Sequence, residues 1–157
     1  MKWVVALILM MMAGTASADG DRMTVPANAK WQEECSSCHV AYPPQLLNKA
    51  GWRKLMSGLD RHFGVDASLE PAERKEILSF LQRHAGSGSR HASSTQRISD
   101  TAWFIHEHRE VTSRIWADPA IRSRSNCTAC HVRAERGDWS ERSIRVPGHR
   151  FEDDDDE

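Results

Sequence analysis

Two short stretches of this chain place two cysteines and a histidine in the same order and spacing. They read Cys35-Ser36-Ser37-Cys38-His39 and Cys127-Thr128-Ala129-Cys130-His131, both of the form C-x-x-C-H. This pattern is the attachment site of a c-type haem. Cysteines three positions apart lie on one side of a helical turn, so both thiols reach the vinyl groups of one macrocycle, and the adjacent histidine binds the iron. The sequence therefore predicts two covalent haem c groups, attached at Cys35, Cys38, Cys127 and Cys130, with His39 and His131 as iron ligands.

Other chemistries of paired cysteines fit this chain less well. The two pairs could form one four-cysteine zinc site, but that would leave both following histidines without a role. A thioredoxin-like redox dithiol accompanies a βαβ pattern, which this sequence does not show. The chain has four cysteines in all, so the two motifs use every one and leave none for a disulfide.

The ligand on the far side of each iron decides what a haem does. A second histidine gives a low-potential electron carrier, a methionine raises the potential, and an open position lets an added ligand bind. Six histidines lie outside the motifs, namely His62, His84, His91, His106, His108 and His149. The distal ligands are expected among them.

For the first haem, the spacing of apolar residues favours His62. It lies three positions after Leu59 and seven after Leu55, so it shares the apolar face of an expected helix. A polar side chain on such a face needs a partner, and an iron would supply one. His84 is the second choice, because it also suits the C-terminus of a helix as a cation. Met56 is the methionine rival, although ordinary core packing explains it as well.

For the second haem, the same argument favours His108. It lies four positions after Phe104 and three before Val111, whereas His106 falls on the polar side with Glu110. We therefore predict His108 as the distal ligand, with His106 as the runner-up. His91 falls in a Gly- and Ser-rich stretch, and His149 adjoins an acidic tail.

The first 18 residues have the three parts of a secretory signal. Lys2 supplies the positive start, residues 3–12 are an unbroken apolar run, and Ala16-Ser17-Ala18 matches a cleavage site. The apolar run is shorter than the ~20 residues that a membrane-spanning helix needs, although an uncleaved anchor is the alternative. Bacterial haem attachment takes place outside the cytoplasm, so the sequence predicts a periplasmic protein whose mature chain has no membrane span.

Helical periodicity dominates the remaining sequence. We expect a helix over residues 30–40 that carries the first motif, a second through residues 52–63, a third over residues 71–84, and a fourth over residues 101–116. A short extended segment is expected over residues 143–147. The predicted fold is therefore mainly α.

The Gly- and Ser-rich stretch near the middle of the chain indicates a linker between two haem units. We expect a signal peptide over residues 1–18, an N-terminal haem domain over 19–86, a linker over 87–98 and a C-terminal haem domain over 99–151. Residues 152–157 are all acidic, which is typical of a solvated tail; contact with a basic redox partner is the functional alternative. Scattered arginines without interleaved aromatics give no indication of nucleic-acid binding.

Four segments resemble a known family. They are C-S-S-C-H-V-A-Y-P-P-Q-L-L, W-R-K-L-M-S-G-L-D-R-H-F-G, W-F-I-H-E-H-R-E-V and N-C-T-A-C-H-V-R-A-E-R-G, and together they are similar to the periplasmic dihaem cytochromes c called DHC. The resemblance runs from about Trp31 to Pro147. It implies an N-terminal domain like class I cytochromes c and a small, mostly helical or irregular C-terminal haem domain. It also implies low-potential haems with two histidine ligands each, which places His62 and His108 as the distal ligands. The implied partners are a small monohaem cytochrome and a membrane cytochrome b.

Electron transfer is therefore the expected function, and we expect no enzymatic activity. Two haems in so short a chain must lie close together, so an electron could enter at one and leave from the other. The sequence contains no Ser-His-Asp, paired-carboxylate or phosphate-loop pattern. The alternative is a haem enzyme, a small dihaem peroxidase or reductase subunit with one open iron. A sensor domain is a third reading, which would need an output module.

Overall fold

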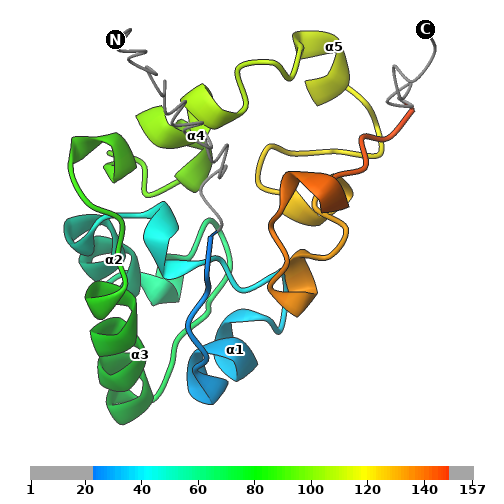
Figure 1. Ribbon diagram of the computed structural model, residues 1–157. Helices are drawn as coiled ribbons and strands as arrows, with labels where there is room; N and C mark the ends of the chain where they lie inside the picture. The colour runs from blue at the N-terminus through cyan, green and yellow to red at the C-terminus, as the bar shows by residue number, and fades with distance from the viewer. Residues whose placement is uncertain (1–22, 149–157) are drawn as a thin grey trace, which may run out of the picture.

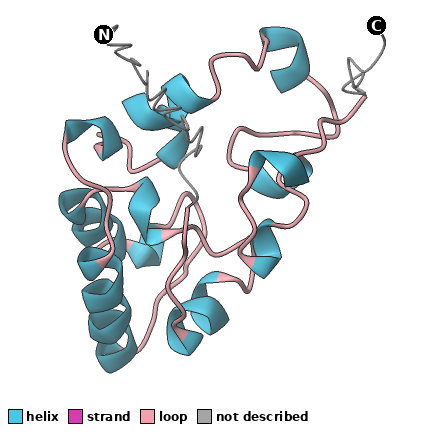
Figure 2. Ribbon diagram, in the orientation of Figure 1, coloured by secondary structure: helices cyan, strands magenta, loops and turns pink. Residues whose placement is uncertain are grey.

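The computed structural model describes residues 23–148 and shows a mainly helical chain (Figures 1 and 2). Its α-helices are α1 (Ala29–Cys35), α2 (Lys49–Met56), α3 (Pro71–Arg83), α4 (Ala102–Glu107) and α5 (Ser113–Trp116), joined by loops and short 3₁₀ helices. Within the described residues, strand pairing is limited to isolated bridges such as that between His131 and Ile144. The predicted fold class is confirmed. The expected signal peptide, His149 and the acidic tail lie outside the described residues.

Helix α1 is shorter than predicted and carries only the start of the first motif. It begins after Asn28, whose side chain accepts a hydrogen bond from the Trp31 amide at 2.8 Å, and it ends at Cys35. The hydroxyl groups of Ser36 and Ser37 donate to the carbonyls of Gln32 and Glu34. Such side-chain bonds to the backbone compete with helix continuation, so the rest of the motif forms a turn.

The second expected helix is interrupted, which corrects the prediction for residues 52–63. Asn48 caps α2 by accepting from the Gly51 amide at 2.8 Å, and the helix ends at Met56. Ser57 then donates to the Lys54 carbonyl, and the chain forms the 3₁₀ helix η2 (Leu59–Arg61). His62 therefore lies just after η2 and not within a continuous amphipathic helix.

The fourth expected helix is also divided. Thr101 caps α4 by accepting from the Phe104 amide at 3.1 Å. The helix ends at Glu107, and Thr112 caps the separate helix α5. His108 consequently follows α4 directly, at the point where the chain turns away from the helix axis.

The hydrophobic core lies in the N-terminal half, where α1, α2 and α3 pack together (Figure 1). Helix α3 matches the prediction closely, with Pro71 at its first position and Ile77, Phe80 and Leu81 buried. The Trp52 indole donates to the Pro44 carbonyl at 2.6 Å and fixes the turn that precedes α2. This packed half provides a rigid base for the first motif.

The Gly- and Ser-rich segment is held against this core and is not a loose connection. The Asn48 amide donates to the His91 carbonyl at 3.0 Å, and the Gly86 amide donates to the Leu47 carbonyl at 2.9 Å. The His91 ring also stacks on Trp103 of α4, with ring centroids 5.6 Å apart. His91 therefore joins the start of α2 to α4.

No helix in the described part of the chain is both long and apolar enough to cross a membrane.

Candidate haem sites

The first motif histidine lies opposite His62. The ring centroids of His39 and His62 are 6.2 Å apart, with 32° between the ring planes. Two metal–imidazole bonds of about 2 Å, plus roughly 1 Å from each nitrogen to its ring centre, put two such rings on the order of 6 Å apart. The spacing therefore fits two imidazoles bound to one iron.

The second motif histidine lies opposite His108 at nearly the same distance. The ring centroids of His108 and His131 are 6.1 Å apart, with 69° between the planes. The two pairs have the same arrangement. In each, the motif histidine faces a histidine that directly follows a short helix. In the first pair that helix is η2, and in the second it is α4.

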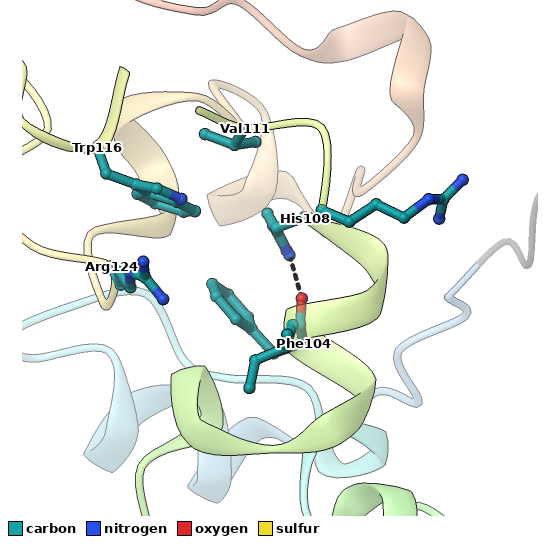
Figure 3. A pocket seen from close by; sticks show the side chains of 7 residues that line it. Phe104, His108, Val111, Trp116 and Arg124 are labelled. Carbon is teal, nitrogen blue, oxygen red and sulfur yellow. Dashed lines mark hydrogen bonds between the residues drawn. The ribbon is translucent and has the colours of Figure 1, made fainter. Parts of the chain in front are cut away.

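Hydrogen bonds orient one ring of each pair. Nδ1 of His39 lies 2.8 Å from the Val40 carbonyl oxygen, and Nδ1 of His108 lies 3.0 Å from the Phe104 carbonyl oxygen (Figure 3). A carbonyl oxygen only accepts, so Nδ1 carries the proton in both rings and Nε2 keeps its lone pair. A histidine that ligates a metal commonly has this arrangement.

Burial favours the metal-binding form of three of these rings, those of His62, His108 and His131. It lowers the pKa of His62, with a smaller contribution from His39. Burial likewise lowers the pKa of His108 and of His131. The neutral imidazole is the metal-binding form, so both pairs are suited to an iron near neutral pH.

The cysteines do not have the properties of a redox dithiol. Burial raises the pKa of Cys35 and of Cys127 to about 11, whereas reactive cysteines have lowered values. Residues 23–148 contain no cluster of three or more His, Cys, Asp or Glu side chains that could hold a metal ion. The two cysteine pairs are therefore not gathered as a four-cysteine zinc site requires.

The rival distal ligands lie elsewhere. His84 ends α3 and packs against Phe80, with centroids 5.1 Å apart, and Met56 is 3% exposed within the N-terminal core. His106 is exposed on α4, and His91 stacks on Trp103. The structure brings His62 and His108, and not these residues, beside the motif histidines.

Two hollows adjoin the histidine pairs. The larger, about 710 Å³, is lined from both motifs, including Cys38, His39 and Cys127, and its volume lies within the roughly 300–1,000 Å³ that is usual for cofactor sites. The smaller, about 190 Å³, is lined by Phe104, His108, Val111, Trp116 and Arg124 among others (Figure 3). The smaller hollow has mainly aromatic and aliphatic walls, whereas the walls of the larger one are mostly polar.

Tyr42 links the two motif regions and was not singled out by the sequence. Its ring stacks on His39 with centroids 4.6 Å apart and 20° between the planes. Its hydroxyl donates to the carbonyl of Ser125 at 2.6 Å, two residues before Cys127. Burial raises the pKa of Tyr42 well above its usual range, and Cys127 adds to this effect. The only pointer in the sequence was that this is the single tyrosine of the chain.

Two C-x-x-C-H motifs, each facing a second histidine in a helical chain, define a c-type cytochrome with two haems. The model of the dihaem cytochrome c family, DHC, matches residues 31–139. The chain belongs to this family, and it carries two covalently bound haem c groups.

Solved structures support the same assignment. The chain is similar to the crystal structure of DHC purified from Rhodobacter sphaeroides, with 42% identity and a TM-score of 0.63 over 73% of this chain and 99% of that one. It is also similar to the dihaem cytochrome c from Shewanella baltica OS155, with 38% identity and a TM-score of 0.67 over 79% of this chain and 96% of that one. No curated protein matches the sequence significantly.

Proposed function

We propose that this protein is a periplasmic electron carrier in which two histidines bind each haem iron. His39 and His62 bind the first iron, and His131 and His108 bind the second. The observation that carries the proposal is the spacing of the two pairs, 6.2 Å and 6.1 Å between ring centroids. Irons bound on both sides leave no position for a substrate, and two nitrogen ligands favour a low potential.

When bound, the haems supply the one-electron chemistry, and the protein supplies position and environment. The carbonyls of Val40 and Phe104 orient the imidazoles of His39 and His108. Burial lowers the pKa of His62, His108 and His131 and so favours their neutral form. Tyr42 contacts the His39 ring and the backbone just before Cys127, so it provides a short route of bonded and packed atoms between the two motif regions.

The finer parts of this proposal rest on the sequence and the family. The signal sequence and the C-x-x-C-H motifs support export to the periplasm. The family resemblance supports a small monohaem cytochrome as electron acceptor and a membrane cytochrome b as a further partner. The same resemblance supports two haem domains, and the Gly- and Ser-rich stretch supports their bounds, 19–86 and 99–151, with residues 87–98 as the linker.

Replacement of the distal histidines tests the ligand assignment. In the haem-loaded protein, we expect His62→Ala and His108→Ala each to convert one haem from a low-spin to a high-spin optical spectrum. Each variant should also let the reduced protein bind carbon monoxide at one haem, because one axial position is then open. His84→Ala and His106→Ala are the matched controls and should keep the spectrum of the unaltered protein.

Two results would contradict the proposal. An unchanged spectrum in His62→Ala or His108→Ala would show that another residue binds that iron, and a changed spectrum in a control would identify it. Rapid carbon monoxide binding by the unaltered reduced protein would show an open iron and would favour the haem enzyme.

A further inference from the structure

The loop that holds His62 has an unusual backbone. The His62 carbonyl accepts from the Val65 amide at 3.0 Å, and the Ala67 amide donates to the Leu59 carbonyl at 2.9 Å. Between them, Phe63 has a φ of 50° and Gly64 a φ of 99°. A left-handed conformation is unfavourable for a bulky residue such as phenylalanine. The two backbone hydrogen bonds hold the turn in this conformation, which fixes where the Phe63 side chain leaves the backbone.

The Phe63 ring packs on the ring of the proposed distal ligand. The centroids of Phe63 and His62 are 4.9 Å apart, with 62° between the planes, an edge-to-face arrangement. Phe63 stays 47% exposed, so burial in the core does not account for its place. The contact instead restricts the position of the imidazole.

The Phe63 ring is also contacted by a residue from a distant part of the chain. The guanidinium carbon of Arg97 lies 4.4 Å from the Phe63 ring centroid, a cation–π contact. Within residues 23–148, no carboxylate lies within ion-pair distance of Arg97. Among the residues that the structure describes, the aromatic ring is therefore the principal partner of this cation.

Local hydrogen bonds fix the backbone around Arg97. Its amide lies 3.2 Å from Oγ1 of Thr95, and its carbonyl accepts from the Asp100 amide at 3.1 Å. Asp100 in turn accepts from the Thr95 hydroxyl. Arg97 thus projects from an ordered turn that leads into the 3₁₀ helix η4 (Ile98–Asp100).

We propose that Phe63 and Arg97 form a clamp that holds the His62 ring toward His39 and keeps the first haem closed to added ligands. The proposal rests on the proposed function, because it takes His62 as an iron ligand. Both clamp members are positioning residues, since they act through His62. The segment that joins the two halves of the chain thereby controls ligand access at the first haem.

Carbon monoxide binding to the reduced, haem-loaded full-length protein tests the clamp. We expect Arg97→Ala and Phe63→Leu to bind carbon monoxide at one haem about tenfold faster than the unaltered protein, as loss of a cation–π or aromatic contact would allow. Arg97→Lys should recover part of the protection because it keeps the cation. Arg90→Ala is the matched control, since Arg90 lies in the same region but pairs with Glu107 at 3.2 Å.

His62→Ala separates the two proposals. If it binds carbon monoxide rapidly while Arg97→Ala and Phe63→Leu behave like Arg90→Ala, the clamp is wrong and the ligand assignment stands. If His62→Ala itself binds no carbon monoxide, the ligand assignment fails and the clamp fails with it. A general loss of folding is recognised by a lowered melting temperature with increased binding at both haems, and this outcome would also count against a specific clamp.

Discussion

At the scale of single residues, Tyr42 combines two roles in one side chain. Its ring supports His39 by stacking, and its hydroxyl ties the first motif region to Ser125. These contacts can be separated by substitution, because one depends on the ring and the other on the oxygen. They make Tyr42 the residue that most directly connects the two haem sites.

We predict that Tyr42→Phe lowers the free energy of unfolding by about 1 kcal/mol, the usual value of one lost hydrogen bond. The ring stays on His39, but the hydrogen bond to Ser125 is lost, so electron exchange between the haems should slow modestly. Tyr42→Leu removes the ring as well and should slow that exchange markedly. Denaturant unfolding measures the first effect and flash photolysis the second. Equal exchange rates in both variants would exclude the ring from the electron route.

At the scale of elements, the sites depend on where short helices end. His62 follows η2 and His108 follows α4, so each leaves its helix where the backbone is free to turn. The 3₁₀ helix η3 (Ser89–His91) plays a different part, because it packs the linker against its neighbours through His91. The stability of the packing around η3 should therefore depend on the charge of the His91 ring.

We predict that protonation of His91 destabilises the fold in mild acid. Burial lowers the pKa of His91 below its ordinary 6.5, Arg90 adds to this, and the Leu46 carbonyl opposes it. Because the unfolded chain takes up the proton more readily, stability is lost as the pH falls through 6.5 toward the folded pKa.

His91→Gln isolates this effect, since glutamine keeps a donor but does not titrate. The variant should lose less stability than the unaltered protein between pH 7 and pH 5, as followed by thermal unfolding at a series of pH values. Identical pH dependence of the two proteins would show that His91 does not titrate on unfolding.

At the scale of the whole molecule, close packing around Gly86 joins the linker to the core. A Cβ at this position would clash with the Gln45 carbonyl oxygen and would lie 2.6 Å from Cγ of the His91 ring. The backbone carbonyl of Gln45 cannot move away from an added Cβ as easily as the end of a flexible side chain could. The junction between the two halves of the chain therefore depends on this glycine.

We predict that Gly86→Ala lowers the free energy of unfolding by about 2 kcal/mol, a typical cost of overpacking. Gly58→Ala is the control, because its nearest contact would be 3.9 Å from the Lys54 carbonyl oxygen, and its effect should stay within about 0.5 kcal/mol. Denaturant unfolding of both variants provides the comparison. Equal effects would mean that the linker yields to the added methyl group.

The sequence alone determined the chemistry that depends on neighbouring residues. Haem attachment requires two thiols and a histidine within five positions, so the motifs identify Cys35, Cys38, Cys127 and Cys130 without any fold. The mainly helical class and the bounds of α3 also followed from local periodicity and from Pro71. The apolar phase pointed to His62 and His108, although the continuous helices assumed in that argument are not formed.

Only the tertiary structure decided what faces the motifs. Ser57 and Thr112 bond to nearby backbone and divide the expected helices, a competition that apolar periodicity does not express. The contacts of Tyr42 with Ser125 and of Arg97 with Phe63 join residues far apart in the chain. Such contacts depend on the packing of the whole molecule, and so does the spacing that suits each histidine pair to one iron.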